Sequence, residues 1–568
     1  MGAALIWTLA SCVAVMALVA GVSWWSARGA SDSCDSYFLA GRGLGATFIA
    51  GSLLLTNLSA EQMVGLNGSA YGYNLSSMAW EVTAAIATVA MAFIFLPRYL
   101  AGAFTTLPEF LASRFDAGTR RLSVLLFLLG YGLVTIPSVL YSGALAVMQF
   151  FDTPALLGIG YVPALWLTVI VIAASGAAYA VFGGLKAVAV SDTLNGIGLL
   201  AIGLLVPVLG LIALGGGDLL DGLAKLTADH PEKLNAIGSA SDPTPFGTIF
   251  TGMIFANLFY WCTNQYVIQR TLGARSLAEG QKGVLASGFF KLLVPFMMMI
   301  PGIIAFHLYG PGLASIDQAY PRLVEDVLPA WLSGVFLAVL LGAVFSSFNS
   351  LLNSAATLFT LDIWAPLKRE KPSDRQLVSV AKRVSVLIAI ASFAVAPLLH
   401  YAEEGLWQIV RIFTGFYNIP TVAVVIVGLF TRCVPAIGAK CAIVFHVIAY
   451  GLLRFVFDDV VTLHFIHLYA ILFVIEVGIM LAAGALRPRA EPYVPPQEQP
   501  VDMTPWRHGR STAFTLLSCV VALYIVFSPL GLAGAETATP AATMLAALLL
   551  ANVAVWAKPG LLRRPRRA

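Results

Sequence analysis

The chain has 568 residues, of which 59% are hydrophobic and only 11% are charged, and its formal net charge is +4 at pH 7. This balance excludes an ordinary soluble globular protein, and no polar segment between the apolar runs is long enough to form a soluble domain. Because the positive charge lies almost entirely in loops, we expect a lipid bilayer, and no nucleic acid, as a partner.

Apolar runs of about 20 residues, long enough to cross a bilayer, predict an all-α integral membrane protein with about fifteen transmembrane helices. In chain order, the expected spans are about 4–27, 44–70, 75–97, 122–150, 158–182, 187–214, 246–266, 281–307, 329–360, 384–400, 404–430, 438–454, 463–484, 512–530 and 540–557.

The distribution of Lys and Arg predicts the orientation. If the chain starts outside, the outer loops contain only Lys225, Lys233, Arg322 and Arg454, and most other cations face the cytoplasm. This asymmetry follows the positive-inside rule, so we expect the N-terminus outside and the basic C-terminus inside. Abundant Ala, Gly, Leu, Val and Arg with few Lys indicate a bacterial protein, and therefore the inner membrane.

The spans fall into groups. A leading helix and linker occupy 1–43, and two sets of five spans follow at 44–214 and 246–430. Because five is odd, the second set enters the membrane from the opposite side, which predicts inverted repeats. The remaining segment, 431–568, holds about four peripheral helices, a cytoplasmic linker at 485–511 and the basic C-terminus.

The first span of each repeat is interrupted by polar residues. The first interruption carries Asn57, Glu61 and Gln62, and the second carries Asn257 and Asn264. An unpaired polar group in hydrocarbon costs several kcal/mol, so such clusters persist where they line a cavity or bind a ligand. Interrupted helices at matching positions of two repeats are typical of the binding site of a secondary transporter.

Other polar or charged residues fall within the spans, and each has a functional and a structural interpretation. They include Glu81, Asp192, Lys291, Ser346, Ser347, Asn349, Asn353, Arg411 and Glu476. Glu81 and Lys291, for example, could simply neutralise each other. No metal motif or nucleophile–base pair accompanies these residues, so we predict that the protein is not an enzyme.

Two kinds of site are expected. Backbone carbonyls beside Leu55 and Leu58, joined by the hydroxyls of Ser346 and Ser347, would form an oxygen cage that suits sodium. Amides, a carboxylate and an ammonium group near aromatic residues are the chemistry of sugar binding, because they hydrogen-bond hydroxyls beside an apolar wall.

Several segments together resemble the sodium/solute symporter family, in particular its sodium/galactose and sodium/glucose members. The resemblance rests on Tyr37–Gly41, Asn57–Gln62, Gly183–Leu185, Ser191-Asp192, Asn257–Leu272, Lys291, Ser346-Ser347 and Asn353-Ser354. It implies a LeuT-type fold of two inverted five-helix repeats. It also implies sugar contacts at Asn57, Gln62, Glu81, Asn257 and Lys291, with Tyr260 as an aromatic inner gate. We add Trp80, Trp261 and Arg411 to the candidate solute contacts. The implied sodium ligands are Leu55, Leu58, Ala343, Ser346 and Ser347, with Asp192 on the exit path as a second cation position.

Arg411 departs from the resemblance, because the galactose member has a glutamine there. A guanidinium in a solute cavity needs an anion or several acceptors. Arg411 would therefore bind the carboxylate of a sugar acid, or it would pair with Glu81 or with Glu403 and Glu404 while the solute is a neutral sugar. We predict a sodium-coupled symporter that imports a hexose or related monosaccharide, with a sugar-acid carrier or a sugar-gated sensor as alternatives.

Overall fold

The computed structural model describes residues 3–27, 42–313, 316–401, 406–457, 459–534 and 539–558. Within α12 the side chains of 177–190, 192 and 193 are not described, nor are those of a few other helical residues, including Leu55. The motif at Tyr37–Gly41 and the acids Glu403 and Glu404 lie outside the described residues.

The described part of the chain is helical throughout and has no strand, only two isolated bridges in its connections. Helix α1 (Ala3–Ala27) precedes the first repeat. The elements of that repeat are α3 (Ala46–Asn57), α4 (Ala60–Gly72), η2 (Leu75–Ser77), α5 (Met78–Val82), α6 (Ala84–Ala90), η3 (Met91–Phe95), α7 (Leu96–Ala101), α8 (Leu107–Arg114), α9 (Ala117–Gly130), η4 (Tyr131–Thr135), α10 (Ile136–Phe151), α11 (Thr153–Leu157) and α12 (Tyr161–Leu214).

The outer connection and the second repeat follow. Their elements are α13 (Leu219–Ala228), η5 (Pro231–Leu234), η6 (Phe246–Phe250), α14 (Gly252–Leu258), η7 (Phe259–Thr263), α15 (Gln265–Leu272), α16 (Leu277–Met298), α17 (Ile300–Tyr309), η8 (Ile316–Gln318), α18 (Ala319–Val327), α19 (Ala330–Thr357), η9 (Leu358–Trp364), η10 (Ala365–Leu367), α20 (Asp374–Val395), η11 (Ala396–Tyr401) and α21 (Leu406–Phe430). The peripheral elements are α22 (Ala436–Gly451), η12 (Leu452–Val456), α23 (Phe465–Leu486), α24 (Gly509–Val526) and α25 (Thr539–Ala557).

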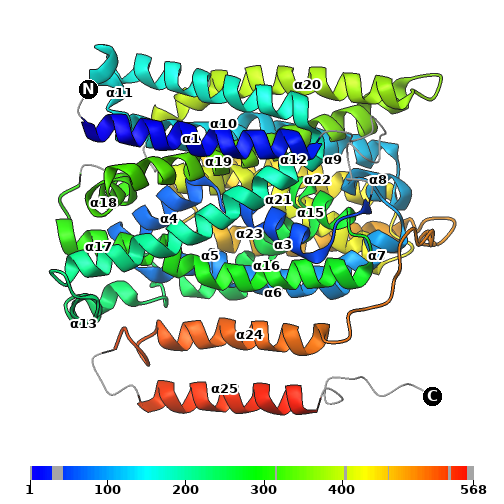
Figure 1. Cartoon of the computed structure of the whole chain (residues 1–568). Helices are drawn as coiled ribbons and strands as arrows, with labels where there is room; N and C mark the ends of the chain where they lie inside the picture. Colours follow the sequence, from blue (N-terminus) through cyan, green and yellow to red (C-terminus); the bar gives the residue numbers. More distant parts are fainter. Residues whose placement is uncertain are drawn as a thin grey trace.

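Most helices run side by side as a bundle, with α24 and α25 stacked along one edge and α20 at the opposite edge (Figure 1). The short elements α3, α4 and α15 lie inside the bundle. The outermost helix, α25, exposes large apolar side chains such as Leu549 (66% exposed) and Leu550 (69% exposed). An apolar outer surface around a buried polar centre is the pattern of a protein solvated by lipid.

Twelve helices in the described residues are long and apolar enough to cross a membrane, so helix length alone does not confirm the expected fifteen spans. The shortfall has a physical reason. Two of the expected spans, 44–70 and 246–266, are broken into shorter helices, and 158–182 and 187–214 belong to the 54-residue helix α12.

Helix α12 packs twice against the same helix. Gly176 faces Phe345 and Phe348 of α19, and Gly198 faces Val339 of α19. A straight helix would place these two glycines about 33 Å apart, whereas their partners span about 14 Å along α19. The element is therefore not straight between Gly176 and Gly198, and the two spans expected there stay a prediction. The boundaries of the two repeats stay a prediction.

A further expected span is divided between two prolines. The segment 281–307 is split between α16 and α17, with Met299 in a non-helical conformation between them. Pro295 lies inside α16 and Pro301 near the start of α17, and proline cannot supply the amide hydrogen that a continuous helix needs.

Candidate functional site

The first interrupted helix opens between α3 and α4, at Leu58 and Ser59. The amide of Leu58 donates to the carbonyl of Leu54 (2.8 Å), and the amide of Ser59 donates to the carbonyl of Asn57 (3.1 Å). In a regular helix the Ser59 amide would donate to the carbonyl of Leu55. At the break, the Ser59 amide therefore does not bond the Leu55 carbonyl.

Four side-chain oxygens at this break have no hydrogen-bond partner among the described residues. They are Asn57 Oδ1, Ser59 Oγ, Glu61 Oε2 and Gln62 Oε1, and the side chains of Asn57, Ser59 and Gln62 are buried. A buried acceptor without a donor costs about 1–3 kcal/mol. These atoms are therefore poised to accept hydrogen bonds from a solute.

The second interrupted helix differs, because the protein itself bonds the side-chain oxygens of Asn264 and Gln265, while Gln265 Nε2 has no partner among the described residues. Its π-helical turn η7 ends at Asn264, whose amide donates to the Phe259 carbonyl (2.8 Å). The hydroxyl of Tyr131 donates to Asn264 Oδ1 (2.5 Å), and Gln265 Oε1 accepts the amide of Leu107 (2.8 Å). This break is thus tied to α8 and to η4 of the first repeat.

A small cavity of about 50 Å³, here the central cavity, lies between the two breaks. Its lining combines Asn57, Ser59, Glu61, Gln62, Thr135, Val139, Ala256, Phe259, Tyr260, Asn264, Tyr266, Ser347, Leu351, Val410, Arg411, Thr414, Tyr417 and Asn418. This volume is below the range of pockets that enclose drug-sized ligands. Of the expected solute contacts, the structure places Asn57, Gln62, Tyr260 and Arg411 directly on its wall.

The remaining expected solute contacts lie behind this wall. Glu81 accepts a hydrogen bond from Gln62 Nε2 (3.2 Å) and forms an ion pair with the ammonium group of Lys291. Lys291 lies 6.0 Å from the ring centre of Trp261. The expected neutralisation of Glu81 by Lys291 is therefore confirmed, and it leaves Gln62 oriented with its oxygen free.

Asn257 and Trp80 are also buried near the cavity. Asn257 Nδ2 donates to Thr83 Oγ1 (2.9 Å). The guanidinium of Arg411 lies over the ring of Trp80, 4.6 Å from its centre, and interacts electrostatically with Glu61. Glu81, a partner considered for Arg411 from the sequence, is instead bonded by Lys291 and Gln62.

The formal charges around the cavity balance. Glu61 and Glu81 carry two negative charges, and Lys291 and Arg411 carry two positive charges. A neutral solute would leave this balance intact, whereas an anionic solute would add one negative charge.

Hydroxyls from α19 form the second polar group. Ala343, Ser346 and Ser347 are buried, and neither serine Oγ has a hydrogen-bond partner among the described residues. Helix α19 packs against both α3 and α4, so it lies beside the Leu55–Leu58 break. Oxygen atoms without donors next to displaced carbonyls fit a hard cation. Asp192 belongs to α12, and its side chain lies outside the described part of the structure.

Sequence reasoning missed some residues of the cavity wall. Thr414 and Asn418 line the cavity with Arg411, at helical spacings of three and seven residues. Residues at this spacing share one face of a helix, so the pattern could have found them. Thr135 and Tyr417, whose hydroxyls are 3.1 Å apart, gave no such signal because they come from helices distant in sequence.

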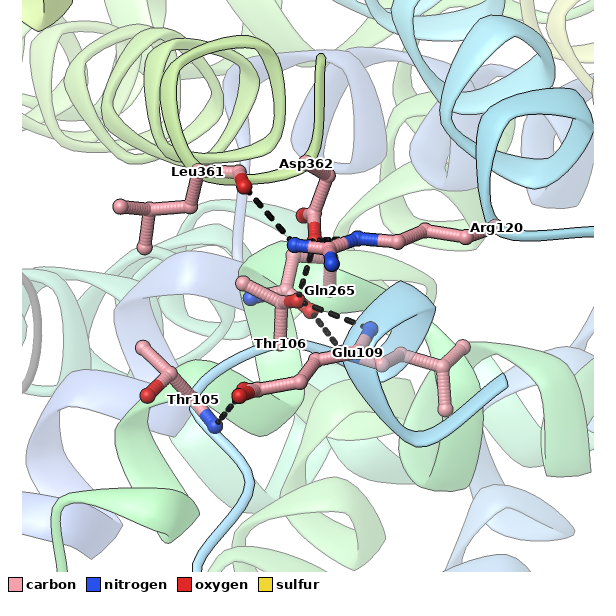
Figure 2. A network of polar contacts seen from close by, with 8 residues as sticks. Thr105, Thr106, Glu109, Arg120, Gln265, Leu361 and Asp362 are labelled. Atoms are coloured by element: carbon pink, nitrogen blue, oxygen red, sulfur yellow. Dashed lines mark hydrogen bonds and ion pairs between the residues drawn. The ribbon is translucent and has the colours of Figure 1, made fainter. Parts of the chain in front are cut away.

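A network of polar contacts, here the inter-repeat network, joins the two repeats near the second break (Figure 2). Arg120 of α9 forms an ion pair with Asp362 of η9 (2.5 Å) and donates to the carbonyl of Leu361 (2.8 Å). Thr106 Oγ1 donates to the same Asp362 oxygen (3.1 Å), and its neighbour Leu107 donates to Gln265. The network thus connects α8 and α9 with α15 and η9.

Comparison with known proteins identifies relatives of this arrangement. The model of the sodium:solute symporter family matches residues 37–445. An uncharacterized symporter, YidK, of Escherichia coli (strain K12) is 45% identical over 517 residues, which are 90% of each chain. The sodium/glucose cotransporter of Vibrio parahaemolyticus is 32% identical over 76% of this chain and 81% of its own. The human sodium/myo-inositol cotransporter 2 is 29% identical over 77% of this chain and 67% of its own.

A solved structure shares the fold. The substrate-bound, outward-open state of a Na⁺-coupled sialic acid symporter matches with a TM-score of 0.74 at 21% sequence identity. The match covers 86% of this chain and 99% of that chain. The expected LeuT-type fold is therefore confirmed.

Proposed function

Because the chain belongs to the sodium:solute symporter family, we propose that this sodium-coupled membrane transporter imports a sugar or a closely related polyhydroxylated ring. The family resemblance seen in the sequence is thereby confirmed, and the protein is a transporter and not an enzyme. The observation that carries the proposal is the pair of open amide oxygens, Asn57 Oδ1 and Gln62 Oε1, beside the ring of Tyr260 on the cavity wall. Open acceptors next to an aromatic face suit a ring that carries many hydroxyls.

The proposed solute contacts divide by geometry. Asn57, Gln62, Tyr260 and Arg411 line the central cavity and would touch the solute. The other proposed residues, Trp80, Glu81, Asn257, Trp261 and Lys291, surround that wall and would orient or complete it. The names of two relatives, a glucose and a myo-inositol cotransporter, support the same solute class.

We propose that the second polar group, formed by the α19 hydroxyls beside the first break, binds sodium as the cosubstrate. The carbonyls of Leu55, Leu58 and Ala343 and the hydroxyls of Ser346 and Ser347 would hold it, with Asp192 as a second cation position. Bound sodium would fix the first break against α19 and so orient Asn57 and Gln62 for the solute. Each ligand would therefore raise the affinity for the other, which is what coupled transport requires.

Transport would proceed by alternating access. Sodium and solute enter a cavity open to one side, the loaded helices rock, and both leave on the other side. The proposed orientation has the N-terminus outside and the C-terminus in the cytoplasm of a bacterial cell, with the protein in the inner membrane. The distribution of Lys and Arg supports this orientation.

Arg411 supports a second candidate solute, a sugar acid. Its guanidinium reaches the cavity wall beside Trp80, where a carboxylate could bind. The balanced charges of Glu61, Glu81, Lys291 and Arg411 favour the neutral sugar, so we place the sugar acid second.

Sodium-driven uptake of labelled galactose into proteoliposomes tests the proposal, with glucuronate and galacturonate as unlabelled competitors. Uptake against a concentration gradient that the uronates leave unchanged would support a neutral-sugar symporter. Uptake abolished by a uronate, and restored in Arg411→Gln, would favour the sugar acid. Sugar binding without accumulation would favour a sensor and overturn the transport proposal.

A further inference from the structure

A buried acid–base pair lies outside the two repeats, in the peripheral helices α22 and α23. His446 Nδ1 hydrogen-bonds Glu476 Oε1, and both side chains have no exposed surface. His446 Nε2 lies 3.1 Å from the carbonyl of Gly415 in α21. Because a carbonyl only accepts hydrogen bonds, His446 Nε2 carries a hydrogen and donates a hydrogen bond to the Gly415 carbonyl of α21. Ionisable residues within a membrane are costly and are retained where they serve a function.

Two tyrosines act on α21 in the same way. The hydroxyl of Tyr450 donates to the carbonyl of Ile412 (2.9 Å), and the hydroxyl of Tyr469 donates to the carbonyl of Arg411 (2.7 Å). The rings of His446 and Tyr450 stack with their centres 5.6 Å apart. We name His446, Tyr450, Tyr469 and Glu476 the α21 bracket.

The bracket needs close contact with α21. A Cβ atom at Gly415 would lie 2.7 Å from the hydroxyl oxygen of Tyr469 and 2.8 Å from that of Tyr450. Real Cβ atoms essentially never come so close to a neighbouring atom. Glycine at this position therefore lets the tyrosines reach the backbone of α21.

The same stretch of α21 carries the cavity wall. Arg411, Thr414 and Asn418 line the central cavity, and the carbonyl of Arg411 is the atom that Tyr469 holds. The bracket thus bonds backbone carbonyls in the same turns of α21 whose side chains line the central cavity. A shift of this backbone would move the Arg411 guanidinium relative to Trp80.

We propose that the α21 bracket consists of positioning residues that hold α21 against α22 and α23 and thereby set the place of Arg411 in the central cavity. The part of this inference that concerns solute affinity rests on the proposed function. The part that concerns α21 does not, and it can be measured without any solute.

The test uses the full chain in two measurements, on Tyr469→Phe and on the matched control Tyr524→Phe. The control removes a hydroxyl on α24 that has no hydrogen-bond partner among the described residues. Hydrogen–deuterium exchange reports how readily the backbone amides open. We expect faster exchange of the amides of 411–418 in Tyr469→Phe but not in the control. Sodium-driven uptake of labelled galactose reports on the binding site. We expect its KM to rise about fivefold while the maximal rate is retained, because a factor of five corresponds to the loss of about one hydrogen bond.

The outcomes separate the two proposals. A Tyr469→Phe protein with exchange and KM equal to those of the control would overturn the bracket, as would an altered KM with unchanged exchange. Faster exchange in a protein that transports no tested sugar would support the bracket and count against the proposed function. A lower maximal rate at unchanged KM would indicate a merely structural role and overturn the positioning proposal. If Tyr469→Phe folds poorly, Tyr450→Phe, which removes the donor to the Ile412 carbonyl, replaces it in the same comparison.

Discussion

In the first interrupted helix the amide oxygens of Asn57 and Gln62 have no partner within the described part of the chain, whereas in the second those of Asn264 and Gln265 are bonded by Tyr131 and by the Leu107 amide. Both breaks expose polar groups in the middle of a membrane bundle, and both border the central cavity. They differ in what satisfies those groups. The first break leaves its acceptors to a ligand, and the second uses them to join helices.

Because the two breaks differ in their hydrogen bonding, substitutions at each of them should have different effects. A buried acceptor without a donor destabilises the folded state, so its removal should cause no loss of stability through hydrogen bonding. A bonded group leaves its partner unsatisfied when it is removed. Substitutions at the first break should therefore weaken ligand binding, and substitutions around the second should weaken the fold.

The largest effect is expected at the inter-repeat network, with Arg120→Ala. The side chain of Asp362 has no exposed surface, so the variant leaves a buried acid without its cation. Removing one partner of a buried ion pair costs about 3–5 kcal/mol. Thermal unfolding in detergent measures the loss. Arg322→Ala, which breaks exposed pairs with Glu325 and Asp326, should cost about 1 kcal/mol or less. Equal losses in the two variants would contradict the role of the network.

A smaller loss of stability is expected for Gln265→Leu at the second break. The variant keeps the volume of the side chain but leaves the buried Leu107 amide without its acceptor, at a cost of about 1–3 kcal/mol. Denaturant or thermal unfolding checks the cost, and the KM for solute should stay near the wild-type value. A large rise of KM at unchanged stability would show that the second break, too, serves the ligand.

Ser347→Ala should raise the sodium concentration for half-maximal uptake about tenfold, which corresponds to about 1.4 kcal/mol. The hydroxyl has no partner among the described residues, so stability should not fall. Ser287→Ala is the matched control, because that buried hydroxyl bonds the carbonyl of Val284 in its own helix. Sodium activation curves of the two variants decide the matter, and an unchanged curve for Ser347→Ala would place the cation elsewhere.

The smallest effect is expected for Asn57→Ala. Loss of one hydrogen bond to the solute should raise the KM about fivefold, while the unfolding temperature stays the same. Asn67→Ala serves as the control, because Asn67 lies on α4 and donates to the Met63 carbonyl without lining the cavity. A drop in stability at unchanged KM would show that the first break, like the second, stabilises the fold and does not serve the ligand.

Several features of the two breaks and of the spans around them could be predicted from the sequence. The polar clusters predicted both interruptions, and the structure breaks the helices at Leu58–Ser59 and at Phe259–Asn264. The ion pair of Glu81 with Lys291 was one of the possibilities considered. Span lengths followed from apolar runs, because the bilayer sets a minimum length for each crossing.

The rest depends on which helix faces meet in space. The stacking of Arg411 on Trp80 joins residues more than 300 positions apart, and no periodicity in either segment indicates it. Asn57 and Asn264 are the same residue type at equivalent breaks, yet a tyrosine hydroxyl bonds the side-chain oxygen of Asn264, whereas Asn57 interacts with Tyr260 and its oxygen has no partner among the described residues. Glu476 stood out in the sequence as an acid within a span, but its partner His446 did not.

The balanced charges around the cavity have an electrical consequence. A membrane voltage of 100 mV does work of about 2.3 kcal/mol on each elementary charge that crosses it. The formal charges of Glu61, Glu81, Lys291 and Arg411 sum to zero, so these four side chains add no net charge to the cavity. With a neutral solute, the voltage would therefore act on the bound sodium during the loaded step.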